Sequence, residues 1–108
     1  MSDAADRARE TAVERALGGP GVASVEARRA AFDNSGMKER DDPRARALID
    51  KVARHAWKVT DADVAEARAA GLSEDEIFEL TVCAAYGQSS RQLQAALDAV
   101  AAATRNER

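Results

Sequence analysis

The chain has 108 residues, of which 45% are apolar and 32% charged, and it carries a net charge of −3 at pH 7 with a pI near 5.2. This length fits one domain, and the mixture of 16 basic with 19 acidic residues forms no dense basic patch for nucleic acid. The sequence has no 18-residue apolar run and no signal-like segment. We therefore expect a cytoplasmic protein that binds neither nucleic acid nor a membrane.

More than half of the apolar residues are alanine, and only 4% of all residues are aromatic. Because alanine buries little area, the core of a monomer would be thin, and we expect an oligomer to bury part of the apolar surface. The one cysteine, Cys83, cannot form an intramolecular disulfide. One cysteine with one histidine, His55, is a poor basis for a zinc site, so we expect no metal or other cofactor.

The first expected helix runs from about Asp3 to Leu17 and ends at the stop signal Gly18-Gly19-Pro20. It has few large apolar residues. We therefore expect residues 1–24 to form an N-terminal helical arm that is mobile or docks only in an assembly. The basic pair Arg28-Arg29 further along the chain is expected to lie on a solvated face.

A second helix, residues 25–33, follows Ser24 as its N-cap, and Asn34-Ser35-Gly36 ends it. After a charged loop at residues 38–42, Asp42-Pro43 reads as the N-cap and first residue of a third helix that runs to about Lys58. On a helical wheel, Trp57 falls on the apolar half of this third helix and His55 just off its edge.

Capping signals divide the second half of the chain. Thr60 with Asp63 predicts the start of a fourth helix, which Gly71 ends as a C-cap. Ser73 with Glu76 opens a fifth helix that is apolar nearly all round and therefore central. Gly87 predicts a break before a sixth helix at residues 90–103, although the last two could instead form one kinked helix.

No alternating β-branched run predicts a strand. We expect an all-α fold of five to six short helices around a central helical hairpin, made by the fourth and fifth. Residues 25–104 would form a single all-helical domain, and residues 105–108 a tail.

Residues 61–97 read DADVAEARAAGLSEDEIFELTVCAAYGQSSRQLQAAL. This stretch resembles the carboxymuconolactone decarboxylase and alkylhydroperoxidase-D-like family, whose pattern is A-x-x-x-G-[LVI]-[ST]-x-x-E-[IL]-x-E before a small-residue-rich helix that ends in Gly. The resemblance extends over residues 44–100 and implies an all-helical dimer, trimer or hexamer. The matching positions are Ala67, Gly71, Leu72, Ser73, Glu76, Ile77, Glu79 and Gly87.

The catalytic patterns of that family are missing from this chain. The redox branch carries C-x-x-C-x-x-x-H, which would fall on Ala56, Val59 and Asp63, and an upstream glutamate, which would fall near Arg44. The decarboxylase branch usually keeps the histidine, which is again Asp63 here. Glu79 is retained. The resemblance therefore implies a member that lacks the CxxC redox motif.

One hypothesis is a non-redox lyase or proton-transfer enzyme that binds a small anionic organic molecule between the third, fourth and fifth helices. Glu79 and His55 are the candidate catalytic residues. An arginine would hold a carboxylate by bidentate hydrogen bonds. The candidate substrate-binding residues are Arg54, Lys58, Asp63, Tyr86 and Arg91.

The candidate catalytic and substrate-binding residues could instead have purely structural roles. Asp63 could be only the N3 carboxylate of the Thr60 cap. Glu79 could pair with Arg54, Lys58 or Arg91, or it could be a buried structural acid that bonds a neighbouring helix or subunit. A second hypothesis is thus a non-catalytic oligomeric binding or assembly module. A third is residual peroxidase activity through Cys83, which is ranked last because the neighbouring Glu79 would raise the pKa of the thiol.

Overall fold

The computed structural model describes residues 4–34 and 42–106, and all regular secondary structure in these ranges is helical. The prediction of an all-α fold is therefore confirmed. The elements in chain order are α1 (Ala4–Gly18), α2 (Val25–Asp33), α3 (Arg46–His55), the short 3-10 helix η1 (Ala56–Lys58), α4 (Asp61–Ala69) and α5 (Glu74–Asn106).

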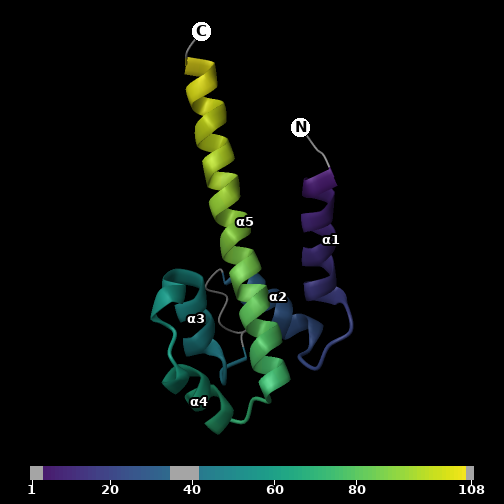
Figure 1. Cartoon of the computed structure of the whole chain (residues 1–108), viewed down its shortest axis with the longest axis vertical. Helices are drawn as coiled ribbons and strands as arrows, with labels where there is room; N and C mark the ends of the chain where they lie inside the picture. Colours follow the sequence, from purple (N-terminus) through teal and green to yellow (C-terminus); the bar gives the residue numbers. More distant parts are fainter. Residues whose placement is uncertain (1–3, 35–41, 107–108) are drawn as a thin grey trace.

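Helix α5 is the centre of the structure, and α1, α2, α3 and α4 all contact it. α1 lies on one side of α5 and runs in the opposite direction, α3 and α4 lie on the other side, and α2 crosses α5 between them (Figure 1). The expected central hairpin is thus replaced by a single central helix, because α4 buries only Ala67 and remains at the edge.

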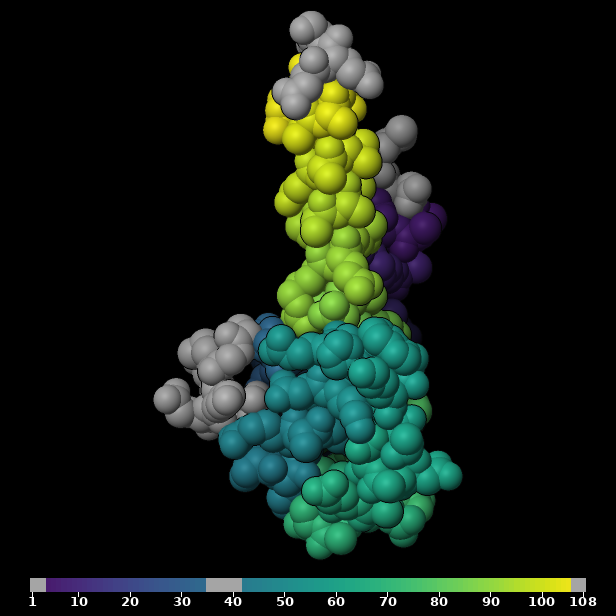
Figure 2. All heavy atoms as spheres, turned by 90° about the vertical axis from the view of Figure 1, so that its left-hand side faces the viewer, coloured from purple at the N-terminus to yellow at the C-terminus, as the bar shows by residue number. Residues whose placement is uncertain are grey.

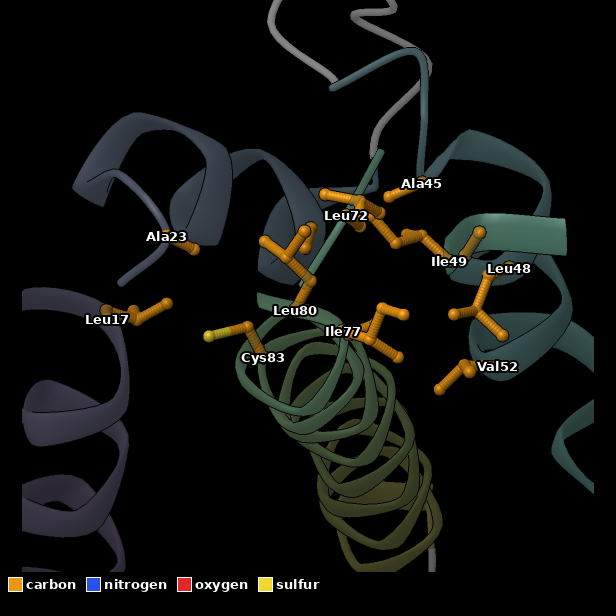
Figure 3. Packing of buried hydrophobic residues seen from close by; sticks show 13 residues of the cluster. Leu17, Ala23, Ala45, Leu48, Ile49, Val52, Leu72, Ile77, Leu80 and Cys83 are labelled. Atoms are coloured by element: carbon orange, nitrogen blue, oxygen red, sulfur yellow. The ribbon is translucent and has the colours of Figure 1, made fainter. Parts of the chain in front are cut away.

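The core forms where α5 faces its neighbours. Leu80 and Cys83 of α5 are the largest fully buried side chains, and Ala31 of α2 packs in the same cluster with no exposed surface. Figure 3 shows side chains of α1 and α3 entering this cluster from opposite sides of α5. Leucine, isoleucine and valine supply most of its volume, on Leu17, Leu48, Ile49, Val52, Leu72, Ile77 and Leu80.

Local capping chemistry explains most helix starts. The Ser24 hydroxyl accepts the Ala27 N–H at 3.0 Å, which caps α2. Ser73 and Glu76 form the predicted reciprocal box, each side chain accepting the backbone N–H of the other at 3.1 Å. Gly71 has φ 111°, a conformation that only glycine adopts easily, so it permits the turn between α4 and α5.

The prediction of a helix break at Gly87 is wrong, and so is the prediction of short helices throughout, whereas the alternative that the last two segments form one helix agrees with the structure. α5 continues unbroken for 33 residues. A Cβ atom on Gly87 would collide with the backbone carbonyl of Phe32 at the end of α2. Glycine therefore serves here to let two helices approach closely, rather than to end one of them.

The predicted start of the third helix at Asp42-Pro43 is also wrong. Residues 43–45 form a turn, and α3 begins at Arg46. The Asp42 carboxylate accepts the backbone N–H of Arg44 at 2.9 Å, two residues along the chain. This hydrogen bond closes a turn through the Asp42 side chain. The turn precedes α3, so Asp42 does not act as the N-cap of the helix.

The last turns of α5 project beyond the rest of the protein. All residues from 91 to 101 are exposed, and two perpendicular views show the end of α5 standing clear of α3 and α4 (Figures 1 and 2). The molecule measures 57 × 27 × 25 Å as a result. No helix in the described part of the chain is long and apolar enough to cross a membrane.

Candidate functional site

Glu79 is bound by the linker between α1 and α2. Its carboxylate accepts the N–H of Val22 at 2.9 and 3.0 Å and the N–H of Ala23 at 3.3 Å. The predicted pairing of Glu79 with Arg54, Lys58 or Arg91 is therefore wrong. A Cβ atom on Gly21 would meet the Glu79 carboxylate, so the Glu79 side chain would have to shift from its present position.

Arg28 lies beside this contact and is almost completely buried, with 4% of its surface exposed. Its Nη1 donates to the carbonyls of Gly19 at 2.8 Å and Ala16 at 3.1 Å, which lie at the end of α1. The expectation of a solvated Arg28 is wrong. The guanidinium satisfies carbonyls that the end of α1 leaves without partners.

Cys83 faces the same region from α5, and its Sγ donates to the carbonyl of Ala16 at 3.5 Å. Burial raises the pKa of the Cys83 thiol, while nearby Arg28 lowers it and Glu79 raises it further. The thiol is only 1% exposed. A protonated, inaccessible thiol is a poor nucleophile, and this geometry does not favour the peroxidase hypothesis.

His55 and its sequence neighbours lie at the end of α3 and in η1, on the opposite side of α5 from Glu79's partners (Figure 1). His55, Arg54 and Lys58 are all exposed. Trp57, which the helical wheel placed on the apolar half, is 75% exposed because the α-helix ends before it, and its ring meets His55 edge-on at 5.2 Å. The candidate catalytic pair is therefore not brought together.

Asp63 holds the start of α4. Its carboxylate accepts the Thr60 N–H at 2.8 Å and two contacts from the Lys51 ammonium, both at 3.0 Å. The Thr60 N–H and then Lys51 lower the pKa of Asp63. Asp63 also lines a cavity of about 160 Å³ between α3 and α4. The other lining residues are Pro43, Arg44, Ala47, Leu48, Glu66, Ala67 and Ala70.

Arg91 caps the other end of α2. Its Nη1 donates to the carbonyl of Phe32 at 2.7 Å and to that of Asp33 at 3.0 Å. Tyr86 is half-buried one turn earlier on α5. The substrate-binding candidates thus lie on different elements, and of the five only Asp63 lines the cavity between α3 and α4. Among the described residues, no group of three or more His, Cys, Asp or Glu side chains could hold a metal ion.

A different feature, absent from the sequence-based site, is an apolar stripe on the projecting part of α5. Leu93, Leu97 and Val100 are 38%, 53% and 63% exposed, and with Thr104 they follow a 4-3-4 spacing that places them on one face. We call these four residues the α5 seam. The spacing is visible in the sequence within the expected sixth helix at residues 90–103, but the sequence alone does not show that this face is left exposed.

A groove of about 330 Å³ lies at the base of the projecting part, between α1 and α5. Its lining residues are Arg9, Glu10, Val13, Glu14 and Ser90. Ser90 precedes Leu93 by three residues, so it lies on the same face of α5 as the seam. The seam therefore continues the side of α5 that faces α1, and the first turns of α1 run beside α5 near the start of the seam (Figure 1).

Comparison of the chain with models of protein families, with curated proteins and with solved structures finds no match.

Proposed function

We propose that this protein is a non-catalytic helical assembly module that works by binding another protein along the α5 seam. The observation that carries the proposal is the exposure of Leu93, Leu97 and Val100 on one face of a helix that projects from the body. A helix face of this kind is typical of a surface that another helix covers.

The chemistry of the candidate catalytic residues supports the module over the enzyme. Both carboxylate oxygens of Glu79 accept backbone N–H groups, so the side chain has a structural task and is not directed at a substrate cavity. His55 is exposed on the other side of α5. General acid–base catalysis needs groups within hydrogen-bond reach of one substrate, and no observation on the described residues favours that arrangement.

Kinship with the carboxymuconolactone decarboxylase and alkylhydroperoxidase-D-like family forms part of the same proposal. It is supported by the turn from α4 to α5, where Gly71 takes a positive φ and Ser73 pairs with Glu76. In this interpretation, the chain keeps the structural motif of the family and uses Glu79 to hold the linker before α2.

Site-specific photo-crosslinking in cells that produce the protein tests the proposal. Benzoylphenylalanine in place of Leu97 should give a protein crosslink, because the seam would be covered. The same group in place of Ala95, which is exposed on the opposite face, is the matched control and should give little product. Equal products at both positions, or none at either, would rule out the seam as the working surface.

A further inference from the structure

We infer that the partner of the α5 seam is a second copy of this chain, paired antiparallel so that Leu97 faces Val100 of the partner subunit. This inference rests on the proposed function and names its partner. A two-fold axis between Asp98 and Ala99 would produce this pairing, and the same axis sets Leu93 against Thr104 of the partner subunit. The seam is thus complementary to itself, as a two-fold interface requires.

The seam residues suit close helix packing. Thr104 donates its hydroxyl to the Val100 carbonyl at 2.9 Å, so its polar group is satisfied within the helix and its methyl group is available to Leu93 of the partner subunit. Small side chains flank the seam at Ala96, Ala101 and Ala103. Alanine at these positions lets two helix backbones approach without large side chains between them.

Charge also favours a second copy. The charged residues of the projecting part, Arg91, Asp98 and Arg105, lie seven residues apart on a row away from the seam. Arg91 is bonded to α2, and Asp98 accepts from Gln94 at 2.8 Å. Helices that select a different partner usually carry selecting charges beside the seam. Here none is present, so identical helices would not repel each other.

The groove between α1 and α5 supports the antiparallel direction. Ser90 lies one turn before Leu93 and faces α1 across this groove. A partner helix in the parallel direction would therefore meet α1 at the level of Ser90. It would also place helices α1 to α4 of both subunits at the same end of the dimer. An antiparallel partner instead places its last turn of α5 beside Leu93, at the mouth of the groove. The groove is lined by Arg9 as well as by Glu10 and Glu14, so that turn meets both signs of charge and no uniformly repelling surface.

The length of the projecting part sets the expected strength. Residues 91–106 span about 24 Å at the helical rise of 1.5 Å per residue. An interface of this length lies at the low end of specific protein interfaces. We therefore expect a reversible dimer with a dissociation constant on the order of 10 μM, which would be invisible in dilute samples and populated in concentrated ones.

The first test is the molar mass of the full chain by sedimentation velocity from about 1 to about 500 μM, a range that brackets the expected constant. The wild-type mass should rise from monomer to dimer. Leu97→Glu should raise the dissociation constant at least about tenfold, whereas the control Ala95→Glu, on the opposite face, should dimerise like the wild type. Circular dichroism must be the same for all three proteins. A wild-type monomer at every concentration, or equal loss in both variants, would overturn the inference.

The second test fixes the direction, with Cys83→Ala as the background so that no native thiol remains. Leu97→Cys is mixed with Val100→Cys and oxidised, and mass spectrometry identifies the disulfides. Antiparallel pairing gives mainly the mixed disulfide between positions 97 and 100. Parallel pairing gives mainly 97–97 and 100–100 products and would overturn the inferred register.

The two proposals can fail separately. If benzoylphenylalanine at position 97 captures a different protein in cells while the purified chain stays monomeric, the module stands and the self-pairing is wrong. If position 97 captures nothing and the chain stays monomeric, both are wrong.

Discussion

The carboxylate of Glu79 accepts the backbone N–H of Val22 through both of its oxygens, at 2.9 and 3.0 Å. The two residues are 57 positions apart in the sequence. This bond, together with the one to Ala23, fixes the linker between α1 and α2 against α5. Glu79 therefore helps to hold α1 on the rest of the chain, together with Arg28 and Cys83, which bond the carbonyl of Ala16.

Replacing Glu79 with glutamine should destabilise the fold. Glu79→Gln keeps the size of the side chain but loses its charge, and a hydrogen bond to a charged group is stronger than a neutral one. We expect the free energy of unfolding to fall by about 1–3 kcal/mol, measured by urea denaturation. Asp75→Asn, an exposed acid on the same helix, is the control and should change stability by less than about 0.5 kcal/mol. Equal effects would mean that the linker contact contributes nothing.

Alanine at position 87 should also be destabilising, contrary to the usual effect of removing glycine from a helix. Gly→Ala inside a helix normally gains about 0.5–1 kcal/mol. At Gly87 the new Cβ would collide with the Phe32 carbonyl, so α2 would have to move. We expect a loss of about 2 kcal/mol or more in the same denaturation experiment. Gly18→Ala at the end of α1, where the Cβ would make only an ordinary contact with the Arg29 side chain at 4.0 Å, should be nearly neutral. A gain in stability from Gly87→Ala would contradict the observed approach of α2.

The buried thiol of Cys83 should make stability depend on alkaline pH. Burial raises the pKa of this thiol in the folded state. The unfolded chain then loses the thiol proton at a lower pH than the folded chain. The protonated thiol therefore contributes fully to the free energy of unfolding below the ordinary thiol pKa, and this contribution is lost as the pH rises through the raised pKa of the folded state. Unfolding free energies measured between pH 7 and pH 10 should fall less steeply for Cys83→Ala than for the wild type. Identical slopes would show that the thiol ionises freely in the fold.

Asp63 should give the opposite dependence, in acid. The Thr60 N–H and the Lys51 ammonium lower its pKa in the folded state. The Asp63 carboxylate therefore contributes to the free energy of unfolding above the ordinary aspartate pKa. This contribution is lost as the pH falls through the lowered pKa of the folded state. Asp63→Asn should weaken the acid dependence of unfolding measured from pH 6 to pH 2. Asp61→Asn, an exposed neighbour, should retain the wild-type profile, and an equal change in both variants would count against the role of Asp63.

Capping residues made much of the fold predictable. α2 has the predicted bounds, and α4 starts within one residue of the predicted cap at Thr60. Ser24, Gly71 and the pair of Ser73 with Glu76 act as their local sequence suggests. These signals work because each involves groups only a few residues apart, so tertiary packing is not needed to satisfy them.

The errors came from residues whose partners lie far along the chain. Gly87 has the local pattern of a helix end, but its role depends on Phe32, and nothing near either residue reveals that contact. The partners of Glu79 are backbone groups, which have no identity in the sequence. Helical periodicity grouped Trp57 with the core because it assumed a helix one turn longer than α3.

The direction of α1 and α5 has a practical consequence. The start of α1 and the end of α5 point to the same end of the molecule (Figure 1). An affinity tag or fluorescent fusion joined to either end of the chain would therefore emerge near Leu97 and crowd it. Measurements of self-association should therefore use untagged protein.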